Sequence, residues 1–235
     1  FRIQNNDALT YATNQHDIVT AVFIFNSNIF DHKREAQKWW VSKSLANFKS
    51  DLKKLNIGLE IIKDDEISFF SKIKSNSKIS IYWNKVYEPT ELEKDKKIGT
   101  DFSKKNIDFK FFKGNVLNEY NKITKNDGTP FKVYSPFWRN AEQFYLERLP
   151  DKINKVKKCK KINTLFKNQI KSEDILPKSD WYKKFEKYWE PSEQKAHENL
   201  DNFVNKGILN YGVDRDFPSI KGTSLLSPYI RNGQI

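Results

Sequence analysis

Methionine is absent from the 235 residues of this chain, cysteine occurs once and histidine occurs three times. Because Cys159 stands alone, no internal disulfide can form, which is typical of a reducing compartment. His16, His32 and His197 are isolated, and none has a second ligand at metal-binding spacing, so we expect no metal site. The longest purely apolar run, Ala21–Phe25, is far too short to cross a bilayer, so we expect no membrane contact.

The lack of methionine also bears on the two ends of the chain. Phe1 cannot be a natural start, and the chain stops at Ile235 just after GTSLLSP, which resembles the opening of a phosphate-binding loop. We therefore expect a fragment that is truncated at both ends. The first residues are polar and form no signal peptide, which together with the single cysteine leads us to expect a cytoplasmic protein.

Sequence motifs of common enzymes are missing too: there is no Walker loop, no GxGxxG and no GxSxG. The net charge is +12, carried by 36 lysines against 6 arginines. Such a basic surface favours a polyanionic partner such as nucleic acid, because bound lysines release counterions. The alternative is that lysine is abundant because of an AT-rich gene and mainly keeps the protein in solution.

Apolar residues in the first half alternate between two spacings. Residues 18–25 (IVTAVFIF) are too continuous for a sheet with one wet face, which indicates a buried parallel strand. Val41, Leu45 and Leu52 share one helical face. We expect strands at 18–25, 57–62, 78–83 and 107–112, and helices at 33–55, 66–73 and 89–98. This alternation predicts βαβ units and an α/β fold with a twisted parallel sheet.

The segments on either side of this pattern are expected to differ from it. The first twelve residues indicate the tail of a first strand, a loop and a helix capped by Asn6 or Asp7. After about Asn126 the periodicity ends, and residues 151–184 hold eleven lysines against four acids, which predicts a long basic connector. From Pro191 a helix is expected, with Ala196, Leu200 and Phe203 on one face.

Six stretches, in order along the whole chain, have a recognisable pattern. They are FRIQNNDAL (1–9), VFIFNSNIF (22–30), SLANFKSDLKKLNIGLEI (44–61), IYWNKVYEPTELEKD (81–95), GTPFKVYSPFWRN (128–140), and a C-terminal set. In that set Trp189, Pro191 and Glu193 open a helix, and Tyr211, Arg215, Asp216 and Pro218 precede GTSLLSP at 222–228. Together these stretches are similar to the DNA photolyase and cryptochrome family.

The resemblance implies three parts. Residues 1–126 would be a Rossmann-like α/β antenna domain with its first strand truncated, and residues 127–188 a basic interdomain connector. Residues 189–235 would begin an all-helical FAD-binding domain, also truncated. GTSLLS would be the first segment that binds the FAD phosphates, at the start of a helix where hydroxyl and N–H groups suit a diphosphate.

The resemblance also assigns individual residues, and each has a simpler alternative. FAD contacts fall on Tyr211, Thr223, Ser224, Leu225, Leu226 and Ser227. Helix capping could explain the three hydroxyls equally, and packing could explain Tyr211. Arg215 would reach a DNA phosphate, or else pair with Asp214 or Asp216. Glu91 would hold an antenna pigment, a folate or deazaflavin, or else simply favour a helix start. Thr90 departs from the family's asparagine, and no catalytic residue is expected in the fragment.

The function that the resemblance implies is light-driven repair of DNA. Reduced, photoexcited FAD would donate an electron to a cyclobutane pyrimidine dimer that is flipped out of damaged DNA. A cryptochrome photoreceptor, a (6-4) photolyase and, more remotely, a stand-alone α/β nucleotide-binding module remain alternatives. We expect a monomer.

Overall fold

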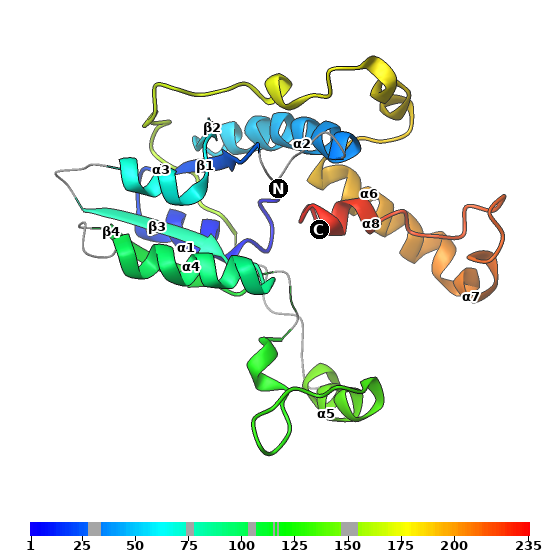
Figure 1. Ribbon diagram of the computed structural model, residues 1–235. Coiled ribbons are helices and arrows are strands. Elements are labelled where there is room, and N and C mark those ends of the chain that lie inside the picture. The colour runs from blue at the N-terminus through cyan, green and yellow to red at the C-terminus, as the bar shows by residue number, and fades with distance from the viewer. Residues whose placement is uncertain (28–33, 74–77, 103–106, 115, 117, 147–154) are drawn as a thin grey trace.

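The chain is described here by a computed structural model that covers residues 1–27, 34–73, 78–102, 107–114, 116, 118–146 and 155–235 (Figure 1). Lys33 of the expected second helix and residues 151–154 of the expected connector therefore lie outside the described residues. The α/β part consists of α1 (Asp7–Gln15), β1 (Thr20–Phe25), α2 (Glu35–Lys54), β2 (Gly58–Lys63), α3 (Glu66–Lys72), β3 (Ile79–Asn84), α4 (Pro89–Phe102) and β4 (Ile107–Phe112). The four strands and three helices expected between residues 18 and 112 are present, with ends that agree within about four residues.

The parallel pairing of the strands confirms the α/β class. The described strands do not, however, form one continuous sheet. β1 pairs with β2 from Thr20 opposite Gly58 onward, and β3 pairs with β4 from Ile79 opposite Ile107. The described strands therefore form two two-stranded parallel sheets, flanked by helices. The tail of a first strand that was expected at the start of the chain is not seen, because residues 1–6 form no strand.

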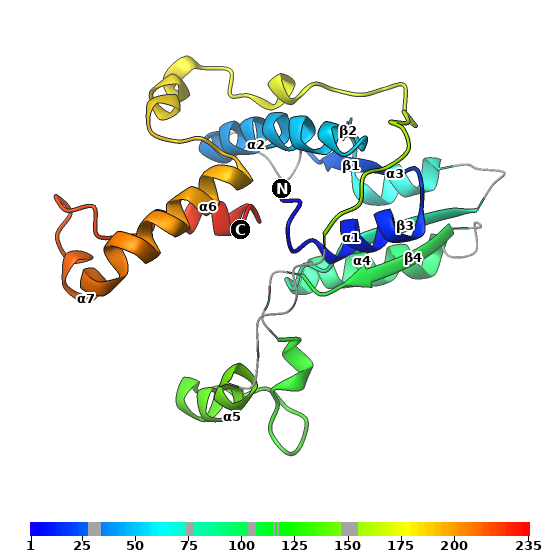
Figure 2. The ribbon, with the colours of Figure 1, turned by 180° about the vertical axis from the view of Figure 1, so that it is seen from behind.

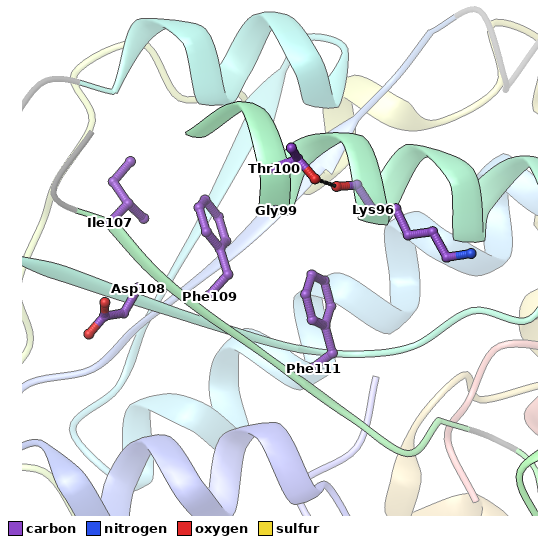
Figure 3. Close-up of a pocket in the computed structure, with 7 residues that line it drawn as sticks. All are labelled: Lys96, Gly99, Thr100, Ile107, Asp108, Phe109 and Phe111. Carbon is purple, nitrogen blue, oxygen red and sulfur yellow. Dashed lines mark hydrogen bonds between the residues drawn. The ribbon is translucent and has the colours of Figure 1, made fainter. Parts of the chain in front are cut away.

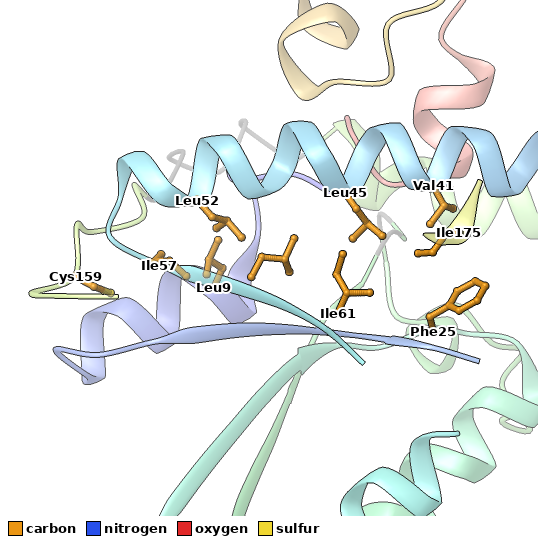
Figure 4. Close-up of a cluster of buried hydrophobic side chains, with 10 residues drawn as sticks. Leu9, Phe25, Val41, Leu45, Leu52, Ile57, Ile61, Cys159 and Ile175 are labelled. Atoms are coloured by element: carbon orange, nitrogen blue, oxygen red, sulfur yellow. The ribbon is translucent and has the colours of Figure 1, made fainter. Parts of the chain in front are cut away.

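α2 covers the sheet of β1 and β2 with the apolar face that the spacing predicts (Figure 4). Leu45 and Leu52 are completely buried, and they pack with Ile57, just before β2, and Ile61 of β2. A second core holds β3 and β4 against α3 and α4 through an aromatic group that includes Phe70. α1 begins at its expected cap, because the Asn6 side chain accepts a hydrogen bond from the Leu9 N–H at 3.1 Å.

The segment after residue 126 is more structured than the sequence indicates. A helix, α5 (Tyr134–Leu146), follows the short 3-10 helix η3 (Tyr120–Lys122), and it stands apart from the sheets in Figure 1. Two further 3-10 helices follow, η4 (Ser172–Ile175) and η5 (Asp180–Lys187). The loss of regular periodicity after Asn126 therefore did not mean the loss of helices, because α5 forms although Ala141 is its only buried residue among those whose side chains are described.

Beyond α5, the described part of the basic connector from Lys155 onward packs against the α/β core. Cys159 N–H donates to the Leu55 carbonyl at 2.8 Å, and Ile170 N–H donates to the Ile61 carbonyl at 2.9 Å. Glu60 of β2 is 3% exposed, and its two carboxylate oxygens accept the N–H groups of Leu165 and Phe166 at 2.6 and 2.9 Å. A buried carboxylate is tolerated here because both oxygens are hydrogen-bonded.

The C-terminal part contains α6 (Glu193–Asn202), a π-helical turn η6 (Phe203–Gly207), a 3-10 turn η7 (Ile208–Asn210), α7 (Tyr211–Asp214) and α8 (Ser227–Arg231). It is joined to α2 by a cluster that we call the tryptophan cluster: Trp39, Trp40, Ala196, Leu226 and Tyr229. Of the face expected on α6, Ala196 is completely buried and Leu200 packs beside it, whereas Phe203 contacts Tyr211 instead.

The two ends of the chain lie side by side (Figure 2). The Arg2 guanidinium donates to the Ile235 carbonyl at 2.9 Å, and the Glu193 carboxylate accepts the N–H groups of Ile3 and Gln4 at 2.6 and 2.8 Å. The start of the α/β part is thereby fastened to α6. No helix in the described ranges has both the length and the apolar character needed to cross a membrane.

Candidate functional site

The loop at residues 222–227 leads directly into α8, as expected for GTSLLS. Leu226 is the N-cap and its side chain is buried in the tryptophan cluster, so no hydroxyl caps the helix. Thr223 and Ser227 are exposed and Ser224 is half-buried. Among the described residues, the three hydroxyls make no hydrogen bond. Capping is therefore not their role here, and they are available to a ligand.

Leu225 has a backbone conformation that leucine rarely adopts. Its φ angle is 55°, in the left-handed region, and its side chain is 53% exposed. A non-glycine residue in this region costs about 1–2 kcal/mol. Strain of this kind is concentrated in ligand-binding loops, where the surrounding structure holds it in place.

Gly222 holds this loop against α7. A Cβ atom at position 222 would lie 2.7 Å from the carbonyl carbon and 2.9 Å from the carbonyl oxygen of Asp214. Only a residue without a side chain permits this approach. The loop and α7 are therefore neighbours, although eight residues separate Gly222 from Asp214 in sequence.

Tyr211 and Arg215 lie together on this neighbouring segment. Tyr211 is 40% exposed and meets Phe203 edge to face at 5.5 Å between ring centroids. The Arg215 guanidinium lies 5.7 Å from the Tyr211 ring centroid, and its Nε is 3.6 Å from Asp216 Oδ1. Arg215 therefore forms the ion pair with Asp216 that was one of its alternatives. The distance between the charged atoms is long for an ion pair, and half of the Arg215 side chain stays exposed.

Several apolar side chains near these residues in sequence are exposed. They are Val204, Ile208, Leu209, Val213, Phe217, Ile220 and Ile230, with exposures between 48% and 94%. Seven exposed apolar residues within 27 positions are more than the single, scattered ones of an ordinary protein surface. Sequence reasoning did not find them, because their spacing follows no single helical face.

A second group of polar residues lies where the parallel strands end, the edge at which α/β sheets bind ligands. Asn84, the last residue of β3, donates to the Asn6 side chain at 2.9 Å and accepts the Ala8 N–H at 3.2 Å. Lys94 bridges Glu66, just beyond β2, at 3.1 Å and Glu91 at 2.6 Å. Glu91 thus lies in the first turn of α4 and is held by an ion pair. Position directly after a strand is the signal that could have identified Glu66.

Asp95, one turn further along α4, has a perturbed acidity. Burial raises the pKa of the Asp95 carboxyl, and a hydrogen bond from Trp83 opposes that rise. Groups with shifted pKa values are enriched at functional sites. Asp95 is therefore a further candidate at this edge of the sheet.

A cavity of about 460 Å³ opens between α4 and β4 (Figure 3). Phe109 and Phe111 rise from β4 toward α4 and form its apolar wall, and Lys96, Thr100 and Asp108 lie at its rim. None of the site residues expected from the sequence lines this cavity.

Metal and thiol chemistry have little support in the described ranges, where no cluster of three or more potential ligands is found. His16 is hydrogen-bonded to the Tyr82 hydroxyl at 2.8 Å. Cys159 is buried in the core, and burial raises the pKa of its thiol, which suits a structural residue.

Comparison with known proteins identifies the family. A family model described as DNA photolyase matches residues 1–155. The chain belongs to the DNA photolyase family. Cryptochrome-1 of Arabidopsis thaliana is also similar, with 24% identity over all of this chain and 35% of its own length.

Two photolyases are more similar. The deoxyribodipyrimidine photo-lyase of Agrobacterium fabrum is 30% identical, over all of this chain and 49% of its own length. The crystal structure of a class III photolyase from Agrobacterium tumefaciens matches with a TM-score of 0.83 and 29% identity, over all of this chain and 48% of that one. This photolyase-family chain thus spans about half the length of these two proteins.

Proposed function

We propose that this chain is part of a light-dependent repair enzyme that splits cyclobutane pyrimidine dimers in damaged DNA, with FAD as its cofactor. The observation that carries the proposal is the loop before α8, with its strained Leu225 and free hydroxyls next to Tyr211 and Arg215. Membership of the photolyase family and 30% identity to a deoxyribodipyrimidine photo-lyase support it.

The residues of the loop fit the phosphate end of FAD. The hydroxyls of Thr223, Ser224 and Ser227 would donate to phosphate oxygens, and the backbone N–H groups at the start of α8 would take part. Leu225 and Leu226 would act through the backbone, since the Leu226 side chain anchors the loop in the tryptophan cluster. Bound and photoexcited, FAD would supply the electron that opens the dimer.

Tyr211 and Arg215 would serve the same site from α7. Tyr211 would lie beside the flavin, since part of its ring is exposed. Arg215, with half of its side chain free, would reach a DNA phosphate and position the strand from which the lesion is flipped. These are positioning and binding roles, and no residue of this chain is proposed as catalytic.

The proposed flavin site is incomplete in this chain. Apolar walls for the isoalloxazine and adenine rings are not formed by the described residues around the loop, whose neighbours have exposed apolar side chains. We infer that this face packs against further helices, in keeping with relatives about twice as long. The three parts expected from the sequence, 1–126, 127–188 and 189–235, remain our proposed division, with the connector fastened to the first part.

For the antenna we propose a folate or deazaflavin at the carboxyl edge of the strands. Glu91 would bind it, held in place by Lys94 and Glu66. Glu91→Ala should then release the pigment while the fold persists, measured by pigment titration and circular dichroism. A chain that shows no affinity for either pigment would leave Glu91 with a role in the ion pair alone. We also propose that the protein is a monomer and lies in the cytoplasm.

A cryptochrome photoreceptor is the second candidate, because Cryptochrome-1 of Arabidopsis thaliana matches the whole chain. A repair enzyme removes cyclobutane dimers under blue light, whereas a photoreceptor leaves them unchanged. The decisive assay therefore measures dimer splitting under blue light. A flavin-containing protein that responds to light but leaves cyclobutane dimers intact would favour the cryptochrome. One that repairs only (6-4) lesions would identify a (6-4) photolyase.

The test of the main proposal compares this chain with a version extended through the rest of its reading frame. We expect this chain alone to retain no FAD at micromolar concentration, because few contacts must offset an entropy cost of at least several kcal/mol. The extended protein should be yellow and should split dimers. In it, Thr223→Ala with Ser224→Ala should weaken FAD retention. If this chain alone purifies with flavin that heating releases, the site is already complete and the argument fails.

A further inference from the structure

The amino ends of β1 and β2 are crossed by the connector, which brings two lysine-rich segments together. Cys159 is held on both sides, by its N–H to the Leu55 carbonyl at 2.8 Å and by its carbonyl to the Asn56 side chain at 2.9 Å. Thr20 Oγ1 donates to the Asn163 carbonyl at 3.2 Å. The connector is thus fixed beside the last turns of α2.

Five lysines belong to these two segments, and we call them the basic edge: Lys49, Lys53, Lys157, Lys158 and Lys161. Lys49 and Lys53 come from α2, and the other three flank the anchored Cys159; all five are exposed. Within the described parts of the chain, none of the five forms an ion pair. Their neighbours Lys54 and Lys160 are paired, with Asp51 and Asp17 at 2.7 and 2.6 Å.

A groove of about 270 Å³ runs between α2 and the connector at this place. Lys49 and Lys53 line one side, and the neutral residues Asn163, Thr164 and Gln169 line the other. Glu60 also borders the groove, but its carboxylate oxygens accept the two connector N–H groups and it is 3% exposed. The groove therefore offers cations and hydrogen-bonding groups with no exposed acid.

We propose that the basic edge binds the phosphate backbone of nucleic acid, as a contact separate from the proposed flavin site. α2 separates the two, because Trp40 of the tryptophan cluster and Lys53 of the basic edge are 13 positions apart on this helix, which is about 20 Å. Figure 4 shows Leu52, Ile57 and Cys159 at one end of the core and Val41 at the other, the end toward the tryptophan cluster. Such a contact would bind any sequence and would hold DNA independently of a lesion.

The test removes four charges from the basic edge and four from elsewhere. Lys53, Lys157, Lys158 and Lys161 are changed to Gln in one variant of this chain. The matched control changes Lys97, Lys122, Lys125 and Lys132, which are exposed and form no ion pair in the described ranges. Binding to an undamaged, fluorescently labelled duplex is measured by anisotropy at salt concentrations from about 50 to 200 mM.

We expect the basic-edge variant to lose more than about tenfold in affinity at the lowest salt, and its plot of log K against log salt to become shallower by about 3 to 4. The control variant should keep the affinity and the salt slope of the unchanged chain. Equal losses in the two variants, or no loss in either, would overturn the proposal. So would binding to phosphatidylserine vesicles without binding to the duplex, which would indicate a membrane surface. Because no flavin is needed, this result is independent of the proposed repair activity.

Discussion

Replacing Gly222 by alanine tests how the loop before α8 is held. The new Cβ would lie 2.7 and 2.9 Å from the carbonyl carbon and oxygen of Asp214, well inside normal contact distance, and neither backbone atom can rotate away. The loop and α7 must therefore separate. Overpacking of this size costs about 1–3 kcal/mol. Gly212 provides a matched control in α7, since a Cβ there meets nothing within 4 Å.

Amide exchange at residues 211–216 measures the local stability of the two variants, and urea unfolding measures their global stability. We expect Gly222→Ala to lower the free energy of amide-exchange protection by about 1–3 kcal/mol. Gly212→Ala should raise it by about 0.5–1 kcal/mol, since alanine loses less backbone entropy than glycine in a helix. In a flavin-containing form of the protein, only Gly222→Ala should weaken FAD retention. The reasoning would be refuted if Gly222→Ala left exchange, stability and flavin content as they were.

Three further substitutions test other parts of the molecule. Leu225→Gly should stabilise the chain by about 0.5 kcal/mol in urea unfolding because it relieves left-handed strain, whereas Leu209→Gly, with no such strain, should destabilise it. Glu60→Ala should cost about 2–4 kcal/mol in the same assay, since two connector N–H groups lose their acceptor, while exposed Glu93→Ala should cost less than about 0.5 kcal/mol. Because burial raises the pKa of Asp95, its ionisation destabilises the folded state as pH rises above the ordinary value of 3.8. Asp95→Asn should therefore be more stable than the parent at neutral pH, with the difference vanishing below about pH 4 in unfolding curves measured across pH.

The α/β part could be predicted closely because its strands and helices each repeat an apolar spacing over their whole length. The strand expected at 107–112 has those bounds in the structure, and the helix expected at 33–55 is Glu35–Lys54. α5 was missed because, among its residues whose side chains are described, only Ala141 is buried, so no buried apolar spacing repeats along it. Short-range patterns carry no information on such elements.

The candidate site was predicted only at the level of residue types. The motif GTSLLS identified the loop, but the closeness of Gly222 to Asp214 depends on how the chain folds back, and sequence spacing does not encode it. Glu60 illustrates the same limit. It stands in a run of strand-forming residues, and its burial is acceptable only because the connector, about a hundred residues later, supplies two hydrogen-bond donors.

The division of the strands into two pairs also affects how molecules of this chain would meet one another. In a two-stranded sheet, each strand leaves one row of backbone donors and acceptors without a strand partner, and the connector covers part of that row on β2. Open rows of this kind accept extended segments from neighbouring molecules. β1 and β3 are the strands most at risk, because their residues are largely apolar or aromatic. We therefore expect a concentrated solution of this chain to associate by strand addition, slowed by the mutual repulsion of molecules that each carry a charge of +12.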